Sequence, residues 1–565
     1  MNEALEKILS DVEEVKQTTV DGIRAKLWKL SQIPKLSATE LYRLQCDAVV
    51  EWLHERGEFY HLATHPDFDG ALYFDRERKL LLRIRADAFL AWLSDTLGMN
   101  RGERGFSMVQ SAVETESLTD RATAIEPALY WSGNLNSSVY LSNGPGHIAK
   151  ITASGVELVD NGTDGVLFSS EAVLPPWQLV DPANPFETCS VFRDLSASAP
   201  HGKLLLALWT ASLPTNQRTK PPLTVTGPVG SGKTRVLVAV FELYGLTPRV
   251  GAVTKSGEGD FWAAMDSGGL CCFDNADTRV DWLPDALAAA ATAGCQEKRR
   301  LYTDSDRVIL RSRSWVAVTS ANPSFAADAG LSDRLLVVRL NRREGGTAEA
   351  ELSDEVQAAR DAGLSWICWM ISAALADTSP VPEGLNQRHP DFATFAVRLG
   401  RAMGCEAEAV AALQAAEADK SLFNLENDYI GAAILETMRS GEPFDGTAAE
   451  LLDRLKTADP SLEGQLSTKR LSKRMSKLWP HMEAVFEASQ ETGHGGALRF
   501  RLKPPQSGDF GDIETAFSEK SLRERNIDTF AKTSIESHQC HQNEDSGSYA
   551  EAENDLFRGV EADPC

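Results

Sequence analysis

The order of apolar and polar positions along the chain separates a helical beginning from a region of short strands. Apolar residues at helical spacing, such as Leu41, Val49 and Trp52, predict helices over residues 1–55. From about 60 to 185 the apolar runs become short and alternating, and turns rich in Asn, Gly, Pro and Asp separate them. This second pattern predicts a β-rich or mixed domain.

Between residues 200 and 345 the pattern alternates between strand and helix. The predicted strands cover 223–226, 247–253, 269–273, 315–319 and 335–340, and the predicted helices cover 232–244, 258–266 and 282–293. Strands that alternate with helices favour a parallel sheet covered on both faces. We therefore expect an α/β fold with a parallel-sheet core in this region.

The C-terminal half contains three further patterns. Residues 346–442 favour a helical bundle, because aromatic residues and alanine-rich faces recur there. Residues 443–503 favour two helices and then a β-hairpin with a Gly-rich turn, an order typical of winged-helix domains. Residues 504–565 are polar and acidic, so we expect a largely disordered tail. The predicted units are 1–59, 60–199, 200–345, 346–442, 443–503 and 504–565.

Composition narrows the classes of function. The 57 basic and 81 acidic residues give a net charge of −24, so contact with nucleic acid requires local basic patches. The nine cysteines include no Cys-x-x-Cys pair, which favours reduced core thiols and argues against zinc. The N-terminus has no apolar targeting segment, and no run approaches the roughly 18 apolar residues of a membrane helix. We expect a cytoplasmic protein without membrane contact.

A glycine-rich loop follows the apolar run at 223–226 and precedes a helix-forming stretch. Its residues are Gly227, Pro228, Val229, Gly230, Ser231, Gly232, Lys233 and Thr234. Glycines let such a loop curl so that its N–H groups point at phosphate oxygens, and the following helix adds its positive end. Lys233 is placed for the β- and γ-phosphates, and Thr234 is placed for Mg²⁺. The motif predicts binding of ATP with Mg²⁺.

About forty residues after Lys233, an apolar strand ends in an acidic residue. Asp274 is placed to complete the Mg²⁺ shell that Thr234 begins. The next residue is Asn275, where hydrolysing enzymes of this type usually carry Glu. An amide orients water without taking its proton, so either hydrolysis is slow or Asp277 serves as the base.

Two more segments add candidate catalytic groups. The strand at 315–319 ends near Asn322, the leading candidate for sensing the γ-phosphate or water, with Thr319 and Ser320 as alternatives. Arg334 precedes the last core strand and is a candidate to stabilise transition-state charge in an adjacent protomer. A simple Asn-Pro turn and a structural salt bridge are the respective alternatives for Asn322 and Arg334.

Two basic segments are candidates for DNA contact. Residues 297–313 predict a β-hairpin with an Asp-Ser-Asp turn, and its candidate contacts are Arg299, Arg300, Arg311 and Arg313. The same side chains suit acidic groups of a neighbouring subunit or plain solvent exposure, and the acidic turn weakens the DNA interpretation. A basic helix in the C-terminal unit adds Lys469, Arg470, Lys473 and Arg474, against the alternative of a solvated face.

The order of these motifs resembles the AAA+ ATPases, and the hairpin ahead of the sensor strand resembles the superfamily 3 helicases within them. Phe273-Asp274-Asn275, Pro284-Asp285-Ala286-Leu287, Leu301-Tyr302-Thr303-Asp304 and Ser332-Asp333-Arg334-Leu335 are similar to ATP-binding proteins of phages, plasmids and mobile elements. The resemblance implies a primase-helicase-like replication ATPase, a family in which Asp-Asn recurs in the second motif. It is specific over 220–340 and weaker over the rest of 60–500. No primase signature is present, so priming requires a partner.

We therefore expect an ATP- and Mg²⁺-dependent motor that assembles into a homo-oligomeric ring, expected to be a hexamer. It would act on single-stranded or forked DNA during replication of a phage or mobile element. The alternative class is a nucleotide-gated switch or scaffold, regulatory or defensive, with slow turnover. Turnover that DNA stimulates favours the motor, and equal turnover with and without DNA favours the switch. A small-molecule kinase that shares only the loop is disfavoured by the downstream hairpin and the Asp-Arg pair.

Overall fold

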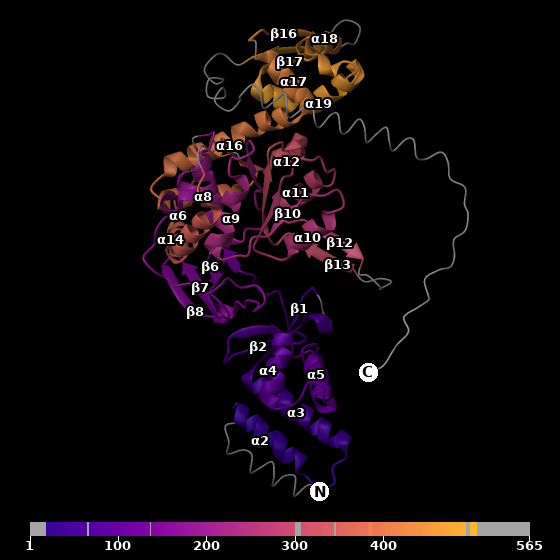
Figure 1. The fold of residues 1–565 in the computed structure, drawn as a ribbon, viewed down its shortest axis with the longest axis vertical. Helices are drawn as coiled ribbons and strands as arrows, with labels where there is room; N and C mark the ends of the chain where they lie inside the picture. The colour runs from indigo at the N-terminus through magenta and orange to yellow at the C-terminus, as the bar shows by residue number, and fades with distance from the viewer. Residues whose placement is uncertain are drawn as a thin grey trace, which may run out of the picture. The chain divides into compact units, whose positions relative to one another are not determined.

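The structure is a computed structural model, which describes residues 19–504 except 65–66, 136, 200, 300–306, 344–345, 384, 386, 440 and 493–497. The acidic tail that we predict to be disordered lies outside the described residues. Figure 1 shows the order of the helices and strands along the chain. In the part of the chain that is described, no helix combines the length and the apolar character needed to cross a membrane.

The first described part of the chain packs helices against a four-stranded sheet. Its elements are α2 (Val20–Ser31), α3 (Ala38–Arg56), β1 (Gly57–Leu62), η1 (Phe68–Gly70), β2 (Ala71–Asp75), β3 (Leu80–Arg83), α4 (Asp87–Leu97), α5 (Arg104–Glu116) and β4 (Thr123–Ile125). The sheet order is β3-β2-β1-β4, and β4 pairs with β1 in parallel. Helix residue Val49 and strand residue Phe59 belong to one buried cluster. The predicted segment 1–59 therefore shares its core with the start of the predicted mixed domain.

A second antiparallel sheet follows, with strands in sequential order. Its elements are β5 (Trp131–Asn134), β6 (Ser138–Ser142), β7 (His147–Thr152) and β8 (Gly155–Asp160), followed by η2 (Thr163–Gly165), α6 (Pro185–Thr188) and α7 (Ser190–Arg193). Trp131, Leu141 and Ile151 lie in the same buried cluster as Leu223 and Val225 of the central sheet. The antiparallel sheet therefore packs together with the central region.

Five parallel strands form the central sheet, in the order β10-β11-β14-β9-β15. The strands are β9 (Leu223–Thr226), β10 (Val250–Ala252), β11 (Leu270–Asp274), β14 (Trp315–Ser320) and β15 (Leu336–Arg339). The accompanying helices are α8 (Gly202–Ser212), η3 (Leu213–Thr215), α9 (Lys233–Tyr244), α10 (Glu258–Asp266), α11 (Leu283–Ala291), η4 (Ser324–Ala327) and α12 (Ala329–Ser332). The inner strands β9 and β14 are buried throughout, as a sheet covered on both faces requires. The predicted parallel α/β core is confirmed.

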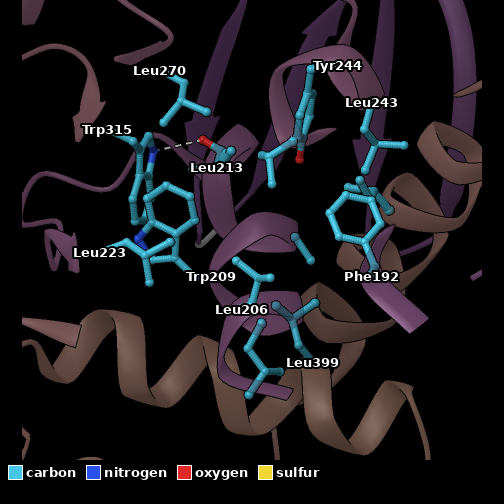
Figure 2. Packing of buried hydrophobic residues seen from close by; sticks show 14 of the residues in the cluster. Phe192, Leu206, Trp209, Leu213, Leu223, Leu243, Tyr244, Leu270, Trp315 and Leu399 are labelled. Atoms are coloured by element: carbon cyan, nitrogen blue, oxygen red, sulfur yellow. Dashed lines mark hydrogen bonds between the residues drawn. The ribbon is translucent and has the colours of Figure 1, made fainter. Parts of the chain in front are cut away.

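Two tryptophans fix one end of this core (Figure 2). The indole N–H of Trp315 donates to the Leu213 carbonyl at 3.0 Å, and that of Trp209 donates to the Pro221 carbonyl at 3.1 Å. The two rings pack edge to face with their centroids 5.7 Å apart. Both N–H groups are buried, and an unpaired buried donor costs about 1–3 kcal/mol. These bonds therefore hold the segment before β9 against the start of β14.

Helices dominate the chain after β15. They are α13 (Glu349–Ala358), α14 (Arg360–Ala376), α15 (Pro390–Ala402), α16 (Glu406–Asn427) and α17 (Tyr429–Met438). The last elements are β16 (Phe444–Thr447), α18 (Ala448–Ala458), η5 (Pro460–Leu462), α19 (Thr468–Val485), β17 (Glu487–Thr492) and β18 (Leu498–Lys503), with the antiparallel sheet order β16-β18-β17. Ile430 and Ile434 of α17 share a buried cluster with Leu471 and Phe500. The core of the C-terminal unit therefore includes a helix that precedes residue 443.

Candidate functional site

The glycine-rich loop connects β9 to α9 at the carboxyl edge of the central sheet. Gly227, Gly230 and Gly232 have φ angles of 153°, 82° and 84°, which residues with a side chain rarely adopt. A β-carbon on Gly227 would lie 2.3 Å from the carbonyl oxygen of Leu340, whereas one on Gly230 or Gly232 would meet nothing within 4 Å. Position 227 therefore requires glycine for space as well as for conformation.

The loop and the first turn of α9 gather hydrogen-bond donors. The N-cap residue Gly232 has no side chain with which to cap the helix, so the first backbone N–H groups of α9 are left for another acceptor. The Ser231 hydroxyl is buried and has no hydrogen-bond partner among the described residues. The Lys233 Nζ donates to the carbonyls of Gly227 at 2.8 Å and Pro228 at 3.1 Å. This set of donors suits an anionic oxygen ligand.

A junction of two hydroxyls and a carboxylate lies beside the loop. The Thr234 hydroxyl donates to Oδ1 of Asp274 at 2.7 Å, and the Thr319 hydroxyl donates to the same oxygen. Strand β14 lies between β9 and β11, so the carboxyl ends of three neighbouring strands meet here. The structure thus brings together Thr234 and Asp274, the predicted Mg²⁺ ligands. The contact of Thr319 with Asp274 is an addition that sequence reasoning missed, although it named Thr319 as a sensor candidate.

The residue after Asp274 adopts a conformation that explains its identity. Asn275 has a φ angle of 52°, in the left-handed region. Asn populates this region far more readily than Glu does, because its short polar side chain bonds to nearby backbone. The Asn275 N–H donates to the Thr319 hydroxyl oxygen at 3.2 Å, which holds the turn in place, and its side chain is exposed. The backbone geometry therefore favours Asn at position 275.

Asp277, the alternative base, holds the segment after β14. Its Oδ1 accepts hydrogen bonds from the Ser320 hydroxyl at 2.6 Å, the Ala321 N–H at 2.6 Å and the Asn322 N–H at 3.0 Å. These bonds fix the backbone of Asn322 at the carboxyl edge of the sheet. Asp277 is therefore placed to position the candidate sensor, and this one oxygen already serves three donors.

Arg334 lies in the short connection between α12 and β15. One of its terminal nitrogens donates to the Gly330 carbonyl, and its Nε is buried without a partner among the described residues. The Nε2 of His389 lies 3.2 Å from the Arg334 carbonyl oxygen and donates to it, since a carbonyl only accepts. Burial lowers the pKa of His389 to about 4, so this imidazole is neutral at physiological pH. In the described part of the chain Arg334 makes no ion pair.

A partly buried charge cluster at the end of β15 was also missed by sequence reasoning. Arg339 pairs with Asp419 at 3.0 Å and with Glu426 at 2.7 Å, both on α16, and its guanidinium lies 4.9 Å from the centroid of the Phe423 ring. Burial lowers the pKa of Arg339, but the two carboxylates raise it by more, so the group stays charged. The one signal in the sequence is an arginine inside the otherwise apolar run 335–340.

The predicted hairpin is present as β12 (Cys295–Arg299) and β13 (Arg307–Arg311), in antiparallel register. Arg300 and the turn lie outside the described residues, and of Arg299 the structure describes only the backbone, which pairs with Arg307. Arg311 and Arg313 both pair with Glu126, at 3.2 and 2.5 Å. DNA contact by these two arginines would therefore have to replace ion pairs within the chain.

The basic helix α19 divides its cations between two roles. Lys469, Arg470 and Lys473 are exposed. The Arg474 Nε, by contrast, donates to Oδ2 of the buried Asp428 at 2.7 Å, and another of its nitrogens donates to a backbone carbonyl near α12 at 3.2 Å. Asp428 also caps the start of α17. Arg474 thus ties α19 both to the start of α17 and to the central region, and the other three candidates are exposed.

The fold and the loop together define an α/β protein whose five-stranded parallel sheet carries a glycine-rich loop after an inner strand. Within this class, residues 195–422 match the family described as actinomycete integrative conjugative element replication protein. The central region of the chain is therefore similar to proteins that replicate such mobile elements.

Two solved structures are also similar to the chain. They are the A form apo structure of the NrS-1 C-terminal region, at 11% identity, and the apo structure of NrS-1 residues 305–718, at 10% identity. Each match covers 81% of this chain and 98% of the other, with a TM-score of 0.36. No curated protein matches the sequence of this chain.

Proposed function

We propose that the protein is an ATP- and Mg²⁺-dependent ATPase of the AAA+ type that acts as a DNA motor in replication of an integrative conjugative element. The observation that carries the proposal is the contact of Thr234 with Asp274 beside a loop whose glycines and helix N-terminus suit phosphate. The match of residues 195–422 to a replication-protein family supports the biological setting.

The residues of the site have distinct roles in this proposal. The loop amides and Lys233 hold the phosphates, in place of the carbonyls that Lys233 now contacts. Thr234 and Asp274 would hold Mg²⁺, which neutralises charge on the phosphoryl group when bound. Thr319 orients the Asp274 carboxylate through its hydrogen bond. Asn275 and Asn322 are placed at the same edge to orient water.

Arg334 is proposed to act on the nucleotide of a neighbouring protomer in a ring. Its guanidinium is free of ion pairs among the described residues, and its backbone is anchored by His389. An arginine in this setting stabilises charge that develops on the transferred phosphoryl group. The neutral state of His389 matters here, because a second cation beside Arg334 would repel it.

The C-terminal unit is the proposed DNA-binding surface. Helices α17, α18 and α19 with the sheet β16-β18-β17 form a winged-helix-like arrangement. Lys469, Lys473 and Lys477 follow one another at four-residue spacing on α19 and are all exposed, so they form one stripe. In a chain with a net charge of −24, such a stripe is a local site for backbone phosphates.

A second candidate function is a nucleotide-gated switch with slow turnover. Asn275 supplies no base, and Oδ1 of Asp277 is already bonded to three donors. On this alternative, nucleotide binding orders an assembly and hydrolysis only resets it. The two functions differ in one measurable quantity, the effect of DNA on turnover.

The deciding experiment measures ATP hydrolysis by the full chain with single-stranded, forked and no DNA. We expect Lys233→Ala to abolish turnover, because the lysine that contacts the phosphates is gone. We expect Arg334→Ala to spare ATP binding and stop turnover. Arg388→Ala is the matched control, because Arg388 is a nearby exposed arginine whose one acidic partner among the described residues is Asp333, at 3.4 Å.

The outcomes separate the candidates. Turnover that rises severalfold with DNA supports the motor, and DNA-independent turnover supports the switch. Retention of full ATP binding by Lys233→Ala would remove the basis of both. If Arg388→Ala lost as much turnover as Arg334→Ala, the assignment of Arg334 would fail.

A further inference from the structure

A pocket of about 550 Å³ lies at the amino edge of the central sheet, opposite the edge that carries the glycine-rich loop. Lys220 precedes β9, Gly268 and Gly269 precede β11, and Arg313 precedes β14. The other wall comes from the chain around β5 and from residues 165–167. Because the antiparallel sheet shares a core with the central sheet, these walls belong to one packed body. The volume is in the range of sites for small ligands, about 300–1,000 Å³.

The lining of this pocket carries uncompensated positive charge. Its charged residues are Arg218, Lys220, Arg313 and Glu126. Arg313 and Glu126 neutralise each other in an ion pair of 2.5 Å. Among the described residues, neither Arg218 nor Lys220 has an acidic partner. The pocket therefore holds two cations that lack an acidic partner in the described part of the chain, although the net charge of the chain is −24.

Lys220 is the more informative of the two cations. It is 5% exposed, and its Nζ donates to the Arg313 carbonyl at 2.6 Å. An ammonium group has three protons, so two remain for other acceptors. Burial lowers the pKa of Lys220 to about 8, and the nearby Cys271 thiol, whose own pKa is raised to about 12, supplies no charge. A buried cation without a counter-ion is unfavourable, and an anion in the pocket would relieve this.

The Gln217 side chain has an acceptor that a hydrogen-bond donor of a ligand would satisfy. Its side chain is 5% exposed, and its Oε1 is buried without a partner among the described residues. The Thr215 hydroxyl donates to the Ser212 carbonyl at 2.6 Å, so it can only accept from Gln217. The Gln217 atom that faces Thr215, at 3.2 Å, must therefore be the NH₂ group. Its carbonyl oxygen is left as an acceptor, which a hydroxyl or amino group of a ligand would satisfy.

We propose that this pocket is a second ligand site, which binds a small phosphorylated molecule with a hydroxyl or amino donor, of the nucleoside monophosphate class. Lys220 and Arg218 hold the phosphate, and Oε1 of Gln217 accepts from the ribose or base. The site is independent of the proposed ATP site, because the two lie at opposite edges of the sheet. A ligand here contacts the connections into β9, β11 and β14, whose far ends carry the loop, Asp274 and Thr319.

The test uses the full chain with Lys233→Ala, so that the glycine-rich loop no longer competes for nucleotide. Titration calorimetry at pH 7 with AMP, with inorganic phosphate and with a short oligodeoxythymidine separates the sources of phosphate. We expect AMP to bind more tightly than inorganic phosphate. We expect Lys220→Met to weaken AMP binding by about tenfold or more, since a lost charge-assisted hydrogen bond has that effect.

Two further variants make the result specific. Arg218→Ala changes an exposed side chain, so it tests the phosphate contact without a risk to folding, and we expect a severalfold loss. Gln217→Leu is expected to weaken binding of AMP more than binding of inorganic phosphate, because only AMP has a ribose and a base. Arg101→Ala is the control, because Arg101 is an exposed arginine between α4 and α5 that pairs with Asp87.

Each outcome decides the proposal. Loss of AMP binding in Lys220→Met and Arg218→Ala supports it. It is overturned if AMP does not bind, or if it binds equally well to both variants. Binding of the oligonucleotide alone, in a manner that depends on Lys220, would replace the small molecule with the nucleic-acid backbone and overturn the monophosphate assignment.

Discussion

The two edges of the central sheet are built in different ways. At the carboxyl edge, one continuous loop supplies most of the donors, the end of β11 supplies the Asp274 carboxylate, and β14 supplies the Thr319 hydroxyl. At the amino edge, the pocket is assembled from several separate stretches of chain, among them 126–132, 165–167 and 216–220. The first site therefore appears in the sequence as a motif, and the second appears only in three dimensions.

The two edges also differ in how they treat buried cations. At the carboxyl edge, Arg339 is neutralised by Asp419 and Glu426, and Lys233 contacts two carbonyls. At the amino edge, Lys220 has a single carbonyl acceptor and no acid among the described residues. We conclude that the charge at Arg339 serves the packing of the fold, whereas the charge at Lys220 is available to a ligand.

The largest expected effect tests the structural cation. Arg339→Met removes the cation that pairs with Asp419 and Glu426, and breaking such a pair costs up to about 3–5 kcal/mol when it is buried. We expect the melting temperature measured by calorimetry to fall by roughly 6–15 °C. Arg342→Met, a change at an exposed arginine nearby, is the control and should melt within about 1 °C of the wild type. Equal melting temperatures of the two variants would show that Arg339 does not stabilise the fold, and the contrast between the two edges would be wrong.

The next effect is the pH dependence that Lys220 confers on stability. Its pKa of about 8 in the folded protein is below the ordinary 10.5, so between these values the unfolded chain binds more protons than the folded chain. The unfolding free energy of the wild type should therefore rise with pH through this window, by up to about 3 kcal/mol relative to Lys220→Met. Urea unfolding of both proteins from about pH 7 to about pH 10 measures this.

The comparison of the two proteins isolates Lys220, because every other titrating group is common to both. The other charged groups that line the pocket are Arg218, Arg313 and Glu126, and burial raises the pKa of the nearby Cys271 thiol to about 12, above the window. A difference between wild type and variant that is constant with pH would show that Lys220 titrates normally. The proposal that the pocket contains a buried cation without a counter-ion would then be wrong.

A smaller effect concerns the Thr319 hydroxyl, which donates to Asp274 at the end of β11. Thr319→Val removes one of the two hydroxyl donors to Asp274 while keeping the shape of the side chain. We expect ATP turnover to fall by about tenfold, equivalent to about 1.4 kcal/mol, with ATP affinity little changed. Thr224→Val on β9 is the matched control, because the Thr224 hydroxyl is buried and has no partner among the described residues. A similar loss in both variants would count against a positioning role.

The smallest expected effect concerns DNA binding, in which an exposed cation should contribute more than a cation that already pairs within the chain. Lys473 is exposed, so Lys473→Ala should weaken duplex binding severalfold and reduce the dependence of log affinity on log salt by about one. Arg313 already pairs with Glu126, so Arg313→Ala should change both quantities less. Fluorescence anisotropy at several salt concentrations measures both. The reverse ranking would place the DNA at the hairpin and not at α19.

The sequence predicted the elements of the central region well. The bounds of β9 and α10 agree with the predicted 223–226 and 258–266, because apolar runs and turn residues determine where such elements begin and end. The pattern did not show which faces meet. Ile430 of α17 looked like part of the helical bundle, yet it packs into the core of the C-terminal unit. Periodicity identifies the buried face of a helix but not the element against which that face packs.

The same limit applied to the candidate site. Thr234 and Asp274 could be placed together, since the ends of parallel strands share an edge. The contacts of Arg313 with Glu126 and of Arg474 with Asp428 could not, because no motif and no shared strand edge links the paired residues in the sequence. A basic residue in a predicted DNA-binding segment therefore has to be checked for an internal acid before it is assigned to phosphate.

Helix α16 has a practical consequence for anyone who divides this protein into fragments. Ala409 lies in the largest buried cluster, Phe423 lies in the cluster around β11, and Leu425 lies in the C-terminal cluster. A fragment that stops just after α16 would leave Leu425 in water, and one that begins at α17 would lack it. Expression of isolated pieces should therefore keep α16 and α17 on the same polypeptide, and insoluble truncations that separate them would say nothing about the activity of the whole.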